Sequence, residues 1–474
     1  MSVGEFVITY DLTQCGTLPR YEYLYRCIRQ DIQNGVLQAN EKLPSKRTLS
    51  QHLSVSVTTI ENAYAILVSE GYIYSKNNSG FFVCPNQAKG QFQPDAFDQE
   101  PQEPEQRIDF KANKCSLSLF PMNTWARLMR QVLSNQDPVL LQTVPYNGLY
   151  ILRRAIASYL YEFKGMRVSP SQIIIGAGTE YLYARLIQLF GPQSVIAMED
   201  PGYKKFSDIS NSYGTVWDYI PMDEYGMRID LLARSRANVV HVSPANHFPT
   251  GIVMPAQRRQ ELLDWAGASP LRYIIEDDYD SELRFSGQAL PTIYSQDSQQ
   301  KVIYLNTFSK TLVPSLRISY MVLPAALKDI YRQQLSFYSC TVSSFEQYGL
   351  AKFIAEGYFE RHINRLKRYY KRQNTQIIQA IQESPLSDIC DIQKCQVGTH
   401  MILRINTKLS DREIHQAAQA LGIDVSLLSD YCHYPSASYF RQIVLNFASL
   451  DPGNIKLAVE LLMDIFEQDI DMKK

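Results

Sequence analysis

The sequence has few of the features that mark membrane or exported proteins. Its 474 residues include no uninterrupted run of about 18 apolar residues, the length that a membrane-spanning helix needs. The first residues, MSVGEFVITYDLTQ, show neither the basic start nor the apolar core of a secretory signal. We therefore expect a cytoplasmic protein without a membrane partner.

Clustered cysteines and a strong net charge are also missing. The eight cysteines form no CxxC pair, so the sequence indicates neither a disulfide framework nor a zinc site. The formal net charge is -1, which gives no global attraction to a polyanion, so any nucleic-acid surface has to be local. The chain does have length, enough for two or three domains and a large core.

A polar segment divides the chain. Residues 87–107 read QAKGQFQPDAFDQEPQEPEQR, which is rich in Gln, Pro and acids and poor in large aliphatic residues. Such a segment cannot bury enough apolar surface to offset the entropy of ordering, so we predict a flexible linker. It separates a domain over residues 1–86 from a larger domain over residues 108–474.

The first domain shows the pattern of three helices and a hairpin. Apolar side chains at helical spacing predict three helices, over residues 21–34, 46–53 and 57–70. Ser45 and Ser56 are the expected N-caps of the last two. Two short strands, 72–74 and 81–83, flank a polar turn. This order predicts a winged helix-turn-helix, in which the third helix enters a major groove of DNA.

The stretch LPSKRTLSQHLSVSVTTIENAYAILVSEGYIYSKNNSGFFV closely resembles the GntR-type winged helix. The resemblance implies a set of residues that meet double-stranded DNA: Arg47, Ser56, Thr58, Thr59, Lys76, Ser79 and Gly80. Hydroxyls and backbone amides at a helix start suit phosphate contacts. Two positions depart from the family, which usually has an arginine at the place of Val57 and often a basic residue at the place of Glu61.

The charge of this domain bears on how it binds. Residues 1–86 contain seven Lys or Arg and seven Asp or Glu, so the phosphate attraction of one domain is modest. Useful affinity then requires two domains on two half-sites. The alternative is a winged helix used for protein contacts, which the small, hydroxylated start of the third helix disfavours.

The second domain alternates helical stretches with short apolar runs. The runs cover residues 173–175, 194–198, 239–242, 273–276 and 301–305. Strands of this kind predict an α/β fold with a mainly parallel sheet buried on both faces. Ligands of such sheets bind at the carboxyl ends of the strands, and polar motifs follow these runs.

The most informative motif follows the fifth run. Lys310 lies between Ser309 and Thr311, with Thr307 before them and Arg317 seven residues later. The amine can form a Schiff base with an aldehyde, while the hydroxyls and the guanidinium can bind a phosphate. Taken alone, a lysine in this setting is usually a solvated surface residue.

The other strands carry complementary motifs. Gly178 and Thr179 open a helix, whose free amides can bind a phosphate. Tyr203 is either a core residue or one that lies flat on an aromatic cofactor. Asp277 and Tyr279 point to the same side of an extended strand, so they can meet a pyridine nitrogen and a ring oxygen. The acidic run that holds them can also be a metal site or a solvated turn.

In this order the motifs resemble those of the fold-type-I aminotransferases, over about residues 110–470. The resemblance implies a smaller C-terminal subdomain and pyridoxal 5′-phosphate (PLP) held by Lys310 as an internal aldimine. It places Asp277 at the pyridine nitrogen, Tyr279 at the ring oxygen and Tyr203 on the ring. The phosphate ligands that it implies within the chain are Gly178, Thr179, Thr307, Ser309 and Arg317.

The resemblance also assigns two residues outside these motifs. Tyr146 matches the tyrosine that reaches the phosphate across a dimer interface, and Arg441 is the candidate for an effector carboxylate. One element departs from the family, because Phe248-Pro249-Thr250-Gly251 stands where aminotransferases have Asn-Pro-x-Gly. Asn246 or His247 is the expected replacement for the missing asparagine.

The succession of a GntR-like winged helix, an acidic linker and an aminotransferase-like domain resembles the MocR/GabR family of bacterial transcriptional regulators, across nearly the whole chain. The segments EDDYDSELRF, NTFSKTLVPSLR and EDPGY are close to the forms of that family. The resemblance implies a homodimeric, PLP-dependent transcription factor that senses PLP or an amino compound through Lys310. Two alternatives stay open: a working aminotransferase with an N-terminal regulatory module, and a PLP-free scaffold.

Overall fold

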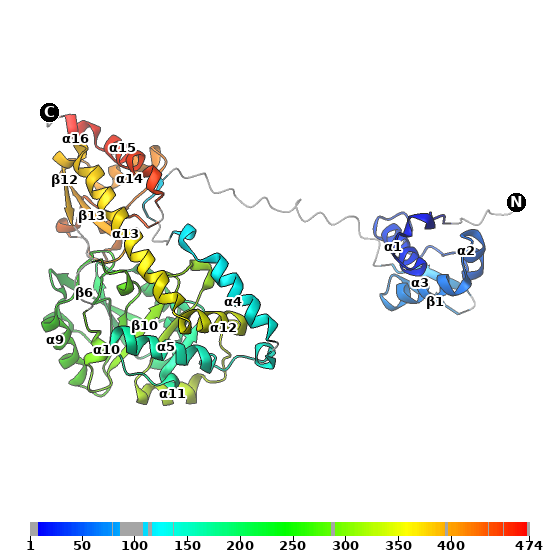
Figure 1. The fold of residues 1–474 in the computed structure, drawn as a ribbon, viewed down its shortest axis with the longest axis horizontal. Coiled ribbons are helices and arrows are strands. Elements are labelled where there is room, and N and C mark those ends of the chain that lie inside the picture. The colour runs from blue at the N-terminus through cyan, green and yellow to red at the C-terminus, as the bar shows by residue number, and fades with distance from the viewer. Residues whose placement is uncertain are drawn as a thin grey trace. The chain divides into compact units, whose positions relative to one another are not determined.

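The polypeptide forms two units, Met1–Pro104 and Glu105–Lys474, each with its own core (Figure 1). The structure is a computed structural model. It describes residues 8–77, 79–85, 108–111, 116–135, 137–285, 290–393, 397–434, 436–448 and 450–471. The linker predicted at 87–107 lies outside the described residues.

The N-terminal unit consists of three helices and a two-stranded hairpin. Its elements are α1 (Arg20–Gln33), α2 (Lys46–His52), α3 (Val57–Ser69), β1 (Ile73–Lys76) and β2 (Gly80–Val83). The Ser45 hydroxyl accepts from the Thr48 amide at 3.1 Å, and Ser56 accepts from Thr59 at 3.2 Å, so both predicted N-caps form. The apolar faces of the helices meet in one core around Leu24, Ile60 and Tyr64. The unit is the winged helix-turn-helix that the sequence predicts.

A sheet of eight strands organises the larger unit. Its order is β4-β11-β10-β9-β8-β5-β6-β7. The strands are β4 (Ile173–Gly176), β5 (Val195–Asp200), β6 (Val216–Asp223), β7 (Gly226–Met227), β8 (Val239–Val242), β9 (Tyr273–Asp277), β10 (Val302–Thr307) and β11 (Ser319–Val322). The central pairs from β10 to β6 run parallel, while β11 and β7 run antiparallel to their neighbours. The predicted mainly parallel sheet is confirmed.

Helices cover both faces of this sheet because successive strand residues point to opposite sides. Ile173 and Ile175 pack into one core with α5 and α13, whereas Ile174 packs into another with α6 and α11. The helices of this part are α4 (Met122–Ser134), α5 (Tyr150–Lys164), α6 (Thr179–Phe190), α7 (Lys204–Ser212), α8 (Ile229–Leu232), α9 (Ala256–Gly267), α10 (Ile293–Gln296), α11 (Ala325–Leu335), α12 (Ser344–Ala355) and α13 (Tyr358–Gln382).

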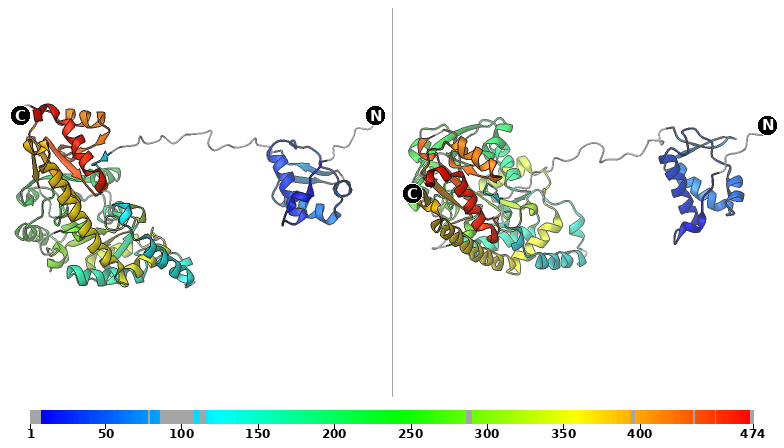
Figure 2. Two further views of the ribbon diagram at one scale, coloured as in Figure 1. Left: turned by 45° about the horizontal axis from the view of Figure 1, so that its top comes forward. Right: turned by 90° about the horizontal axis from the view of Figure 1, so that it is seen from above.

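The C-terminal elements form a smaller subdomain at one end of the unit, drawn in orange and red in Figure 2. A four-stranded antiparallel sheet, in the order β12-β13-β16-β15, is its base. The elements are β12 (Cys390–Gln393), β13 (His400–Ile405), α14 (Asp411–Ala420), β14 (Ile423–Asp424), β15 (Ser426–Leu427), β16 (Gln442–Asn446), α15 (Ile455–Ile465) and α16 (Glu467–Asp471). Strand β14 pairs in parallel with β3 (Ile108–Asp109), the first described segment after the N-terminal unit.

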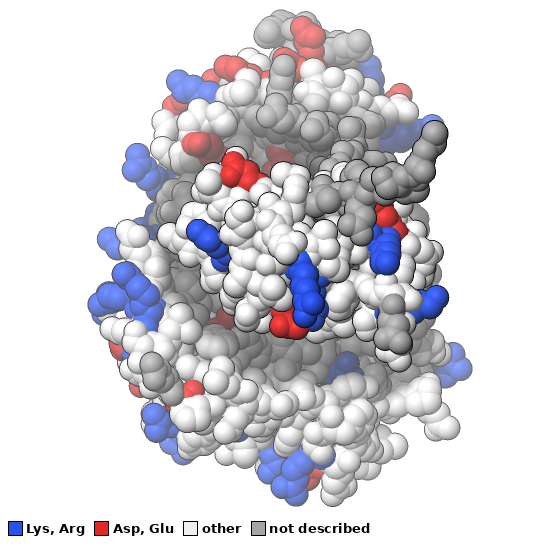
Figure 3. Space-filling view, turned by 90° about the vertical axis from the view of Figure 1, so that its right-hand side faces the viewer, with Lys and Arg blue, Asp and Glu red and all other residues white. Residues whose placement is uncertain are grey.

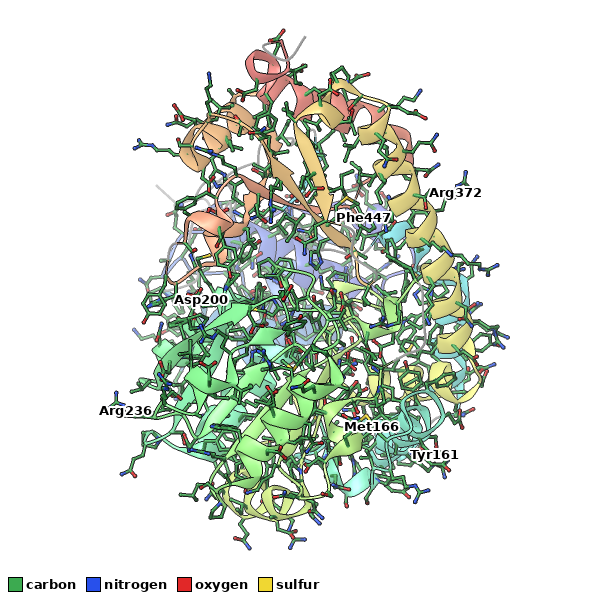
Figure 4. All side chains as sticks on the ribbon, turned by 90° about the vertical axis from the view of Figure 1, so that its left-hand side faces the viewer. Tyr161, Met166, Asp200, Arg236, Arg372 and Phe447 are labelled. Atoms are coloured by element: carbon green, nitrogen blue, oxygen red, sulfur yellow. The ribbon has the colours of Figure 1, made fainter. Side chains whose placement is uncertain are left out.

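The junction between the large sheet and the subdomain is held by backbone and carboxylate contacts. The Asp200 carboxylate, at the end of β5, accepts from the amides of His433 and Tyr434 at 2.7 and 2.9 Å. The Gly202 amide donates to the Tyr431 carbonyl at 3.0 Å. Asp200 and Phe447, labelled in Figure 4, come from the two sides of this junction. None of the described helices is long and apolar enough to span a membrane.

Candidate functional site

A cavity of about 210 Å³ lies at the carboxyl ends of the central strands. It gathers side chains from loops after β4, β5, β8, β9 and β10, which is where a doubly covered parallel sheet leaves room for a ligand. Nine predicted residues line it together: Gly178, Thr179, Tyr203, Asp277, Tyr279, Thr307, Ser309, Lys310 and Arg317. Segments far apart in the sequence therefore meet at one place.

The start of α6 forms one end of the pocket. Gly178 is the N-cap, with φ 96°, a backbone conformation that favours glycine. A Cβ atom at this position would lie 2.5 Å from Nη2 of Arg317, so glycine allows the guanidinium to cross the end of the helix. Free backbone amides and a guanidinium converge here, as anion binding requires.

An acidic side chain occupies the same end. Glu180 forms ion pairs with both Arg317 and Lys205. Burial alone would raise the pKa of the Glu180 carboxyl, but hydrogen bonds from Lys205 and Arg317 lower it below its usual range. The carboxylate thus remains charged and engages the guanidinium that a phosphate would use.

The acid at the opposite side of the pocket is buried. Asp277 is 7% exposed, and its Oδ1 has no hydrogen-bond partner among the described residues. Its Oδ2 lies 3.8 Å from Nε2 of His241, which rises from the neighbouring strand β8 between Phe206 and Tyr183. A buried carboxylate oxygen without a donor is costly, so this atom is suited to a ligand that donates a proton or a hydrogen bond.

Tyr279 stands beside Asp277 and is fixed by Asn246. Its hydroxyl donates to the Asn246 carbonyl at 3.0 Å, and the Asn246 amide group donates to Asp280 Oδ2 at 2.8 Å. Burial raises the pKa of Asp280 to about 8, although Asn246 and Lys310 oppose the shift. Asn246 therefore positions Tyr279 from behind, while His247 lines the cavity itself.

The outer wall contains Tyr203 and a second buried acid. Tyr203 is 42% exposed and makes edge contacts with Phe206 and Phe248. Glu199 lies 3.4 Å from Nε2 of His247, and burial raises the pKa of its carboxyl to about 8. Burial lowers the pKa of His247 to about 3, so the pair is uncharged near neutral pH.

Lys310 lies in the turn after β10. The Thr307 hydroxyl oxygen accepts from the Ser309 amide at 3.2 Å and from the Ser319 hydroxyl at 2.8 Å, which fixes the turn. Lys310 and Arg317 are two basic side chains that line the cavity, and Lys310 is the primary amine that faces it. Its position can place an amine next to Asp277, Tyr279 and the α6 amides.

The carboxylates of the acidic run at 276–280 are buried, so the run is not a solvated turn. Glu276 accepts from the amides of Ile293 and Tyr294, both at 2.8 Å. Asp278 pairs with the buried Lys164 at 2.5 Å. Within the described parts of the chain, no group of three His, Cys, Asp or Glu side chains could hold a metal ion.

Two residues assigned to ligands lie outside the cavity. Tyr146 stacks on Tyr331, with ring centroids 6.1 Å apart, and does not line the pocket of its own chain. Arg441 borders a separate surface depression of the subdomain, where its Nε donates to the Leu409 carbonyl at 3.2 Å. The chain turns at Arg441, with φ 61°, before β16 begins. The geometry therefore gives no support to an effector role for Arg441.

The winged helix presents its predicted DNA contacts on the surface. Arg47, Ser56, Thr58, Lys76 and Gly80 are exposed, and Thr59 and Ser79 are partly exposed. Figure 3 shows Lys, Arg, Asp and Glu interspersed with uncharged residues on the face turned to the viewer. The exposed residues of the winged helix offer hydroxyls, backbone amides and cations to phosphates.

Both units match known families. Residues 20–83 match the bacterial regulatory proteins of the gntR family, and residues 105–461 match aminotransferase class I and II. The chain is 35% identical over 460 residues to the uncharacterized HTH-type transcriptional regulator YdeL of Bacillus subtilis, covering 96% of this chain and 98% of that protein. It is 30% identical over 469 residues to the probable rhizopine catabolism regulatory protein MocR of Rhizobium meliloti, covering 95% and 94%.

The chain belongs to the MocR-type family of HTH transcriptional regulators. Another relative, 27% identical over 438 residues, is the pyridoxine biosynthesis regulator PdxR of Corynebacterium glutamicum, with 92% of this chain and 94% of that protein covered. The GntR-like and MocR-type predictions are thus confirmed.

Solved structures show the fold of the large unit of this MocR-type regulator. A multiple substrate aminotransferase from Thermococcus profundus superposes with a TM-score of 0.69 at 24% identity, covering 80% of this chain and 97% of that one. Kynurenine aminotransferase from Pyrococcus horikoshii gives 0.68 at 23% identity, with the same coverage. The predicted fold-type-I aminotransferase architecture is confirmed.

The sequence patterns assign no role to His241 and Glu199, which line the pocket of this MocR-type regulator, or to Glu180, which pairs with the lining residue Arg317. A lone histidine in a buried parallel strand, as His241 is in β8, is the signal that could have been used. Glu180 gives no such signal, because its partner Arg317 is remote in the sequence.

Proposed function

We propose that this MocR-type regulator holds PLP in the pocket around Lys310 and couples that binding to DNA recognition by its winged helix. The observation that carries the proposal is the convergence of Lys310, Asp277 and the start of α6 in one cavity. A primary amine, a buried acid and an anion seat are the three groups that a phosphorylated pyridine aldehyde requires.

The residues fit PLP at each of its polar ends. The Oδ1 atom of Asp277, buried and without a partner among the described residues, would receive a pyridine N–H. The α6 amides, Thr179 and Arg317 would hold the phosphate, beside Thr307 and Ser309. Tyr279 would meet the ring oxygen and Tyr203 the ring face.

The chemistry follows from the groups that the chain supplies. When bound, PLP supplies an aldehyde that condenses reversibly with primary amines and a ring that withdraws electrons. Lys310 provides one such amine, and an amino compound that enters the pocket competes with it. Asp277 would stabilise a protonated pyridine nitrogen, because a buried carboxylate favours a nearby positive charge.

We also propose that the regulator acts as a homodimer. Tyr146 lies outside the pocket of its own chain, so it is available to a partner subunit. Between residues 122 and 150, the part of the chain that contains Tyr146, large apolar side chains are exposed, namely Leu141 at 85%, Met122 at 64%, Tyr150 at 60% and Leu133 at 54%. A set of this size favours burial against a second copy.

Coupling to DNA requires that the ligand prefers one arrangement of the large unit. A ligand shifts an equilibrium only by its difference in affinity for the two states, and the DNA then changes ligand affinity by the same factor. Lys310, the Asp200 contacts and the subdomain share one end of the sheet, so a change at the amine is next to the junction. Repeated chemical turnover is not required.

The test combines absorbance with operator binding for the full-length protein, Lys310→Ala and the control Lys371→Ala, which changes an exposed lysine on α13. With PLP, the wild type and the control should show the near-visible band of a lysine-bound pyridoxal and a change in operator affinity of about fivefold or more. Lys310→Ala should lose both. An unchanged spectrum in Lys310→Ala overturns the assignment, and repeated release of a keto acid from an amino donor would establish an aminotransferase instead.

A further inference from the structure

The recognition helix α3 presents an unusual set of side chains to solvent. Ile60, Ala63, Tyr64 and Leu67 are buried in the core of the winged helix. The opposite face exposes Val57, Thr58, Glu61 and Asn62 in its first two turns. Because the N-terminal residues of a recognition helix reach base edges, these four are the side chains in position to read sequence.

Glu61 is an acid on a surface that approaches phosphates. Its side chain is 54% exposed, and Oε1 accepts from Nζ of Lys46 at 2.6 Å. Lys46 comes from α2 and also lies over the ring of Phe81 in the wing, with Nζ 5.4 Å from the ring centroid. The ion pair therefore places Glu61 and offsets the repulsion that a lone carboxylate would feel near DNA.

The carboxylate selects among bases by its chemistry. An ionised carboxylate only accepts hydrogen bonds. In the major groove, guanine presents two acceptors, and adenine presents an acceptor next to its donor, while cytosine presents the N4 amino donor. A carboxylate in this position is attracted to cytosine and repelled by guanine.

Val57 offers a second, apolar contact. Its side chain is 43% exposed at the first position of α3, one turn before Glu61. An aliphatic group at a base edge has one specific partner in the major groove, the C5-methyl group of thymine. Thr58 and the Ser56 cap lie beside it and can contact phosphate, so the apolar group is held among polar contacts.

We infer that this regulator reads its operator through an acceptor and a methyl contact, with Glu61 selecting cytosine and Val57 selecting thymine in each half-site. The inference rests on the proposed DNA binding and adds its base specificity. Specificity here does not depend on a guanidinium bound to guanine at the start of α3, because the chain has no arginine there.

The first test is selection of bound duplexes from a random library by the full-length protein and Glu61→Gln, at one salt concentration. Glutamine can pair with adenine, so one position per half-site should change from cytosine to adenine, with discrimination altered by about fivefold or more. Glu22→Gln is the control, because Glu22 pairs with Arg26 at 2.7 Å on α1 and its loss changes the charge equally. It should leave base preferences unchanged.

The second test removes a methyl group from the DNA. Replacing thymine by deoxyuridine at one selected position should weaken wild-type binding by about threefold, since one methyl contact is lost. Val57→Ser should bind both duplexes equally, because its polar side chain offers the methyl group no apolar partner. Val68→Ala, a change at the exposed end of the same helix, should keep the wild-type difference.

The outcomes separate this inference from the proposed function. Enrichment of a motif by the wild type, together with the altered profile of Glu61→Gln, supports both. A motif that is identical for the wild type and Glu61→Gln overturns the cytosine contact and leaves DNA binding intact. A wild type that enriches no motif overturns specific DNA binding, and the inference with it.

Discussion

The side chains assigned to DNA are exposed or partly exposed on the winged helix, whereas several of those assigned to the ligand are buried in the large unit. Arg47 and Thr58 are exposed, while Asp277 and Thr307 are each 7% exposed. Surface residues can change without disturbing a core, so their loss reports on binding alone. Buried polar residues support both fold and function, so each needs a neighbour of similar burial as a control.

The largest expected effect is on PLP binding when the buried carboxylate of Asp277 is replaced. Asp277→Asn should weaken PLP binding by about tenfold to a hundredfold at pH 7, since a hydrogen bond to a charged group is lost. Asp280→Asn is the matched control, because Asp280 is a neighbouring buried carboxyl that does not line the pocket, and burial raises its pKa to about 8. Absorbance titration with PLP measures both. Equal losses would show that burial, and not charge, governs the pocket.

A smaller effect is expected on the exposed side of the comparison. Arg47→Ala should weaken operator binding by roughly threefold to tenfold and lower the salt slope by about one, as the loss of one phosphate contact does. Arg26→Ala removes an exposed arginine on α1 that pairs with Glu22 and should change neither quantity. Titrations at several salt concentrations give the slopes. Parallel lines for the wild type and Arg47→Ala would exclude the contact.

A gain of about threefold in PLP affinity is expected from Glu180→Gln. The carboxylate holds Arg317, so its removal leaves the guanidinium to the phosphate. Asp230→Asn breaks an exposed pair with Arg228 elsewhere and is the control. Binding that becomes weaker in Glu180→Gln would mean that Glu180 orients Arg317 and does not compete for it.

The smallest expected effect is on stability between pH 6.5 and 8.5. Burial raises the folded pKa of Glu199 and Asp280 to about 8 and of Glu276 to about 7, so the folded state binds more protons than the unfolded state in this range. Stability of the large unit therefore falls as pH rises, because ionisation is easier in the unfolded chain. Below the pKa values that these carboxyls have in the unfolded chain, both states are protonated, and the contribution of these groups to the free energy of unfolding no longer changes with pH.

Histidines act in the opposite direction at lower pH. Burial lowers the folded pKa of His247 to about 3 and of His400 to about 4, so the stability that these neutral histidines contribute is lost as pH falls below about 6.5.

Calorimetry tests the carboxyl effect. The unfolding temperature of the large unit should fall by a few degrees from pH 6.5 to 8.5, and that of the winged helix should change less. Equal shifts of both transitions would contradict the burial argument.

The sequence predicted the parts of the fold that repeat a simple pattern. Apolar runs such as 239–242 are strands with both faces buried, and the polar motifs after them line one pocket. Strand β6 has no such apolar run, because Val216–Asp223 is partly exposed and mixes charged with apolar residues. Strand β11, four residues long, lacked any flanking signal and is defined by its antiparallel pairing with β10.

Contacts between distant segments limit how much of the candidate site can be predicted from the sequence. The pairing of Glu180 with Arg317 and of Asp277 with His241 depends on which strands are neighbours, and the spacing along the chain does not contain that order. Arg441 was assigned to an effector carboxylate from the resemblance to the aminotransferases, and the sequence could not show that the turn before β16 directs its Nε to the Leu409 carbonyl.

The pairing of β3 with β14 decides where the described part of the large unit begins. Strand β3 is its first described segment, and the partner strand belongs to the subdomain, so the large unit begins at the subdomain and not at the central sheet. That subdomain is also fastened to the loop of Tyr203 through Asp200 and Gly202. A rotation of the subdomain about this fastening would carry β3 with it, and so would move the point at which the large unit begins.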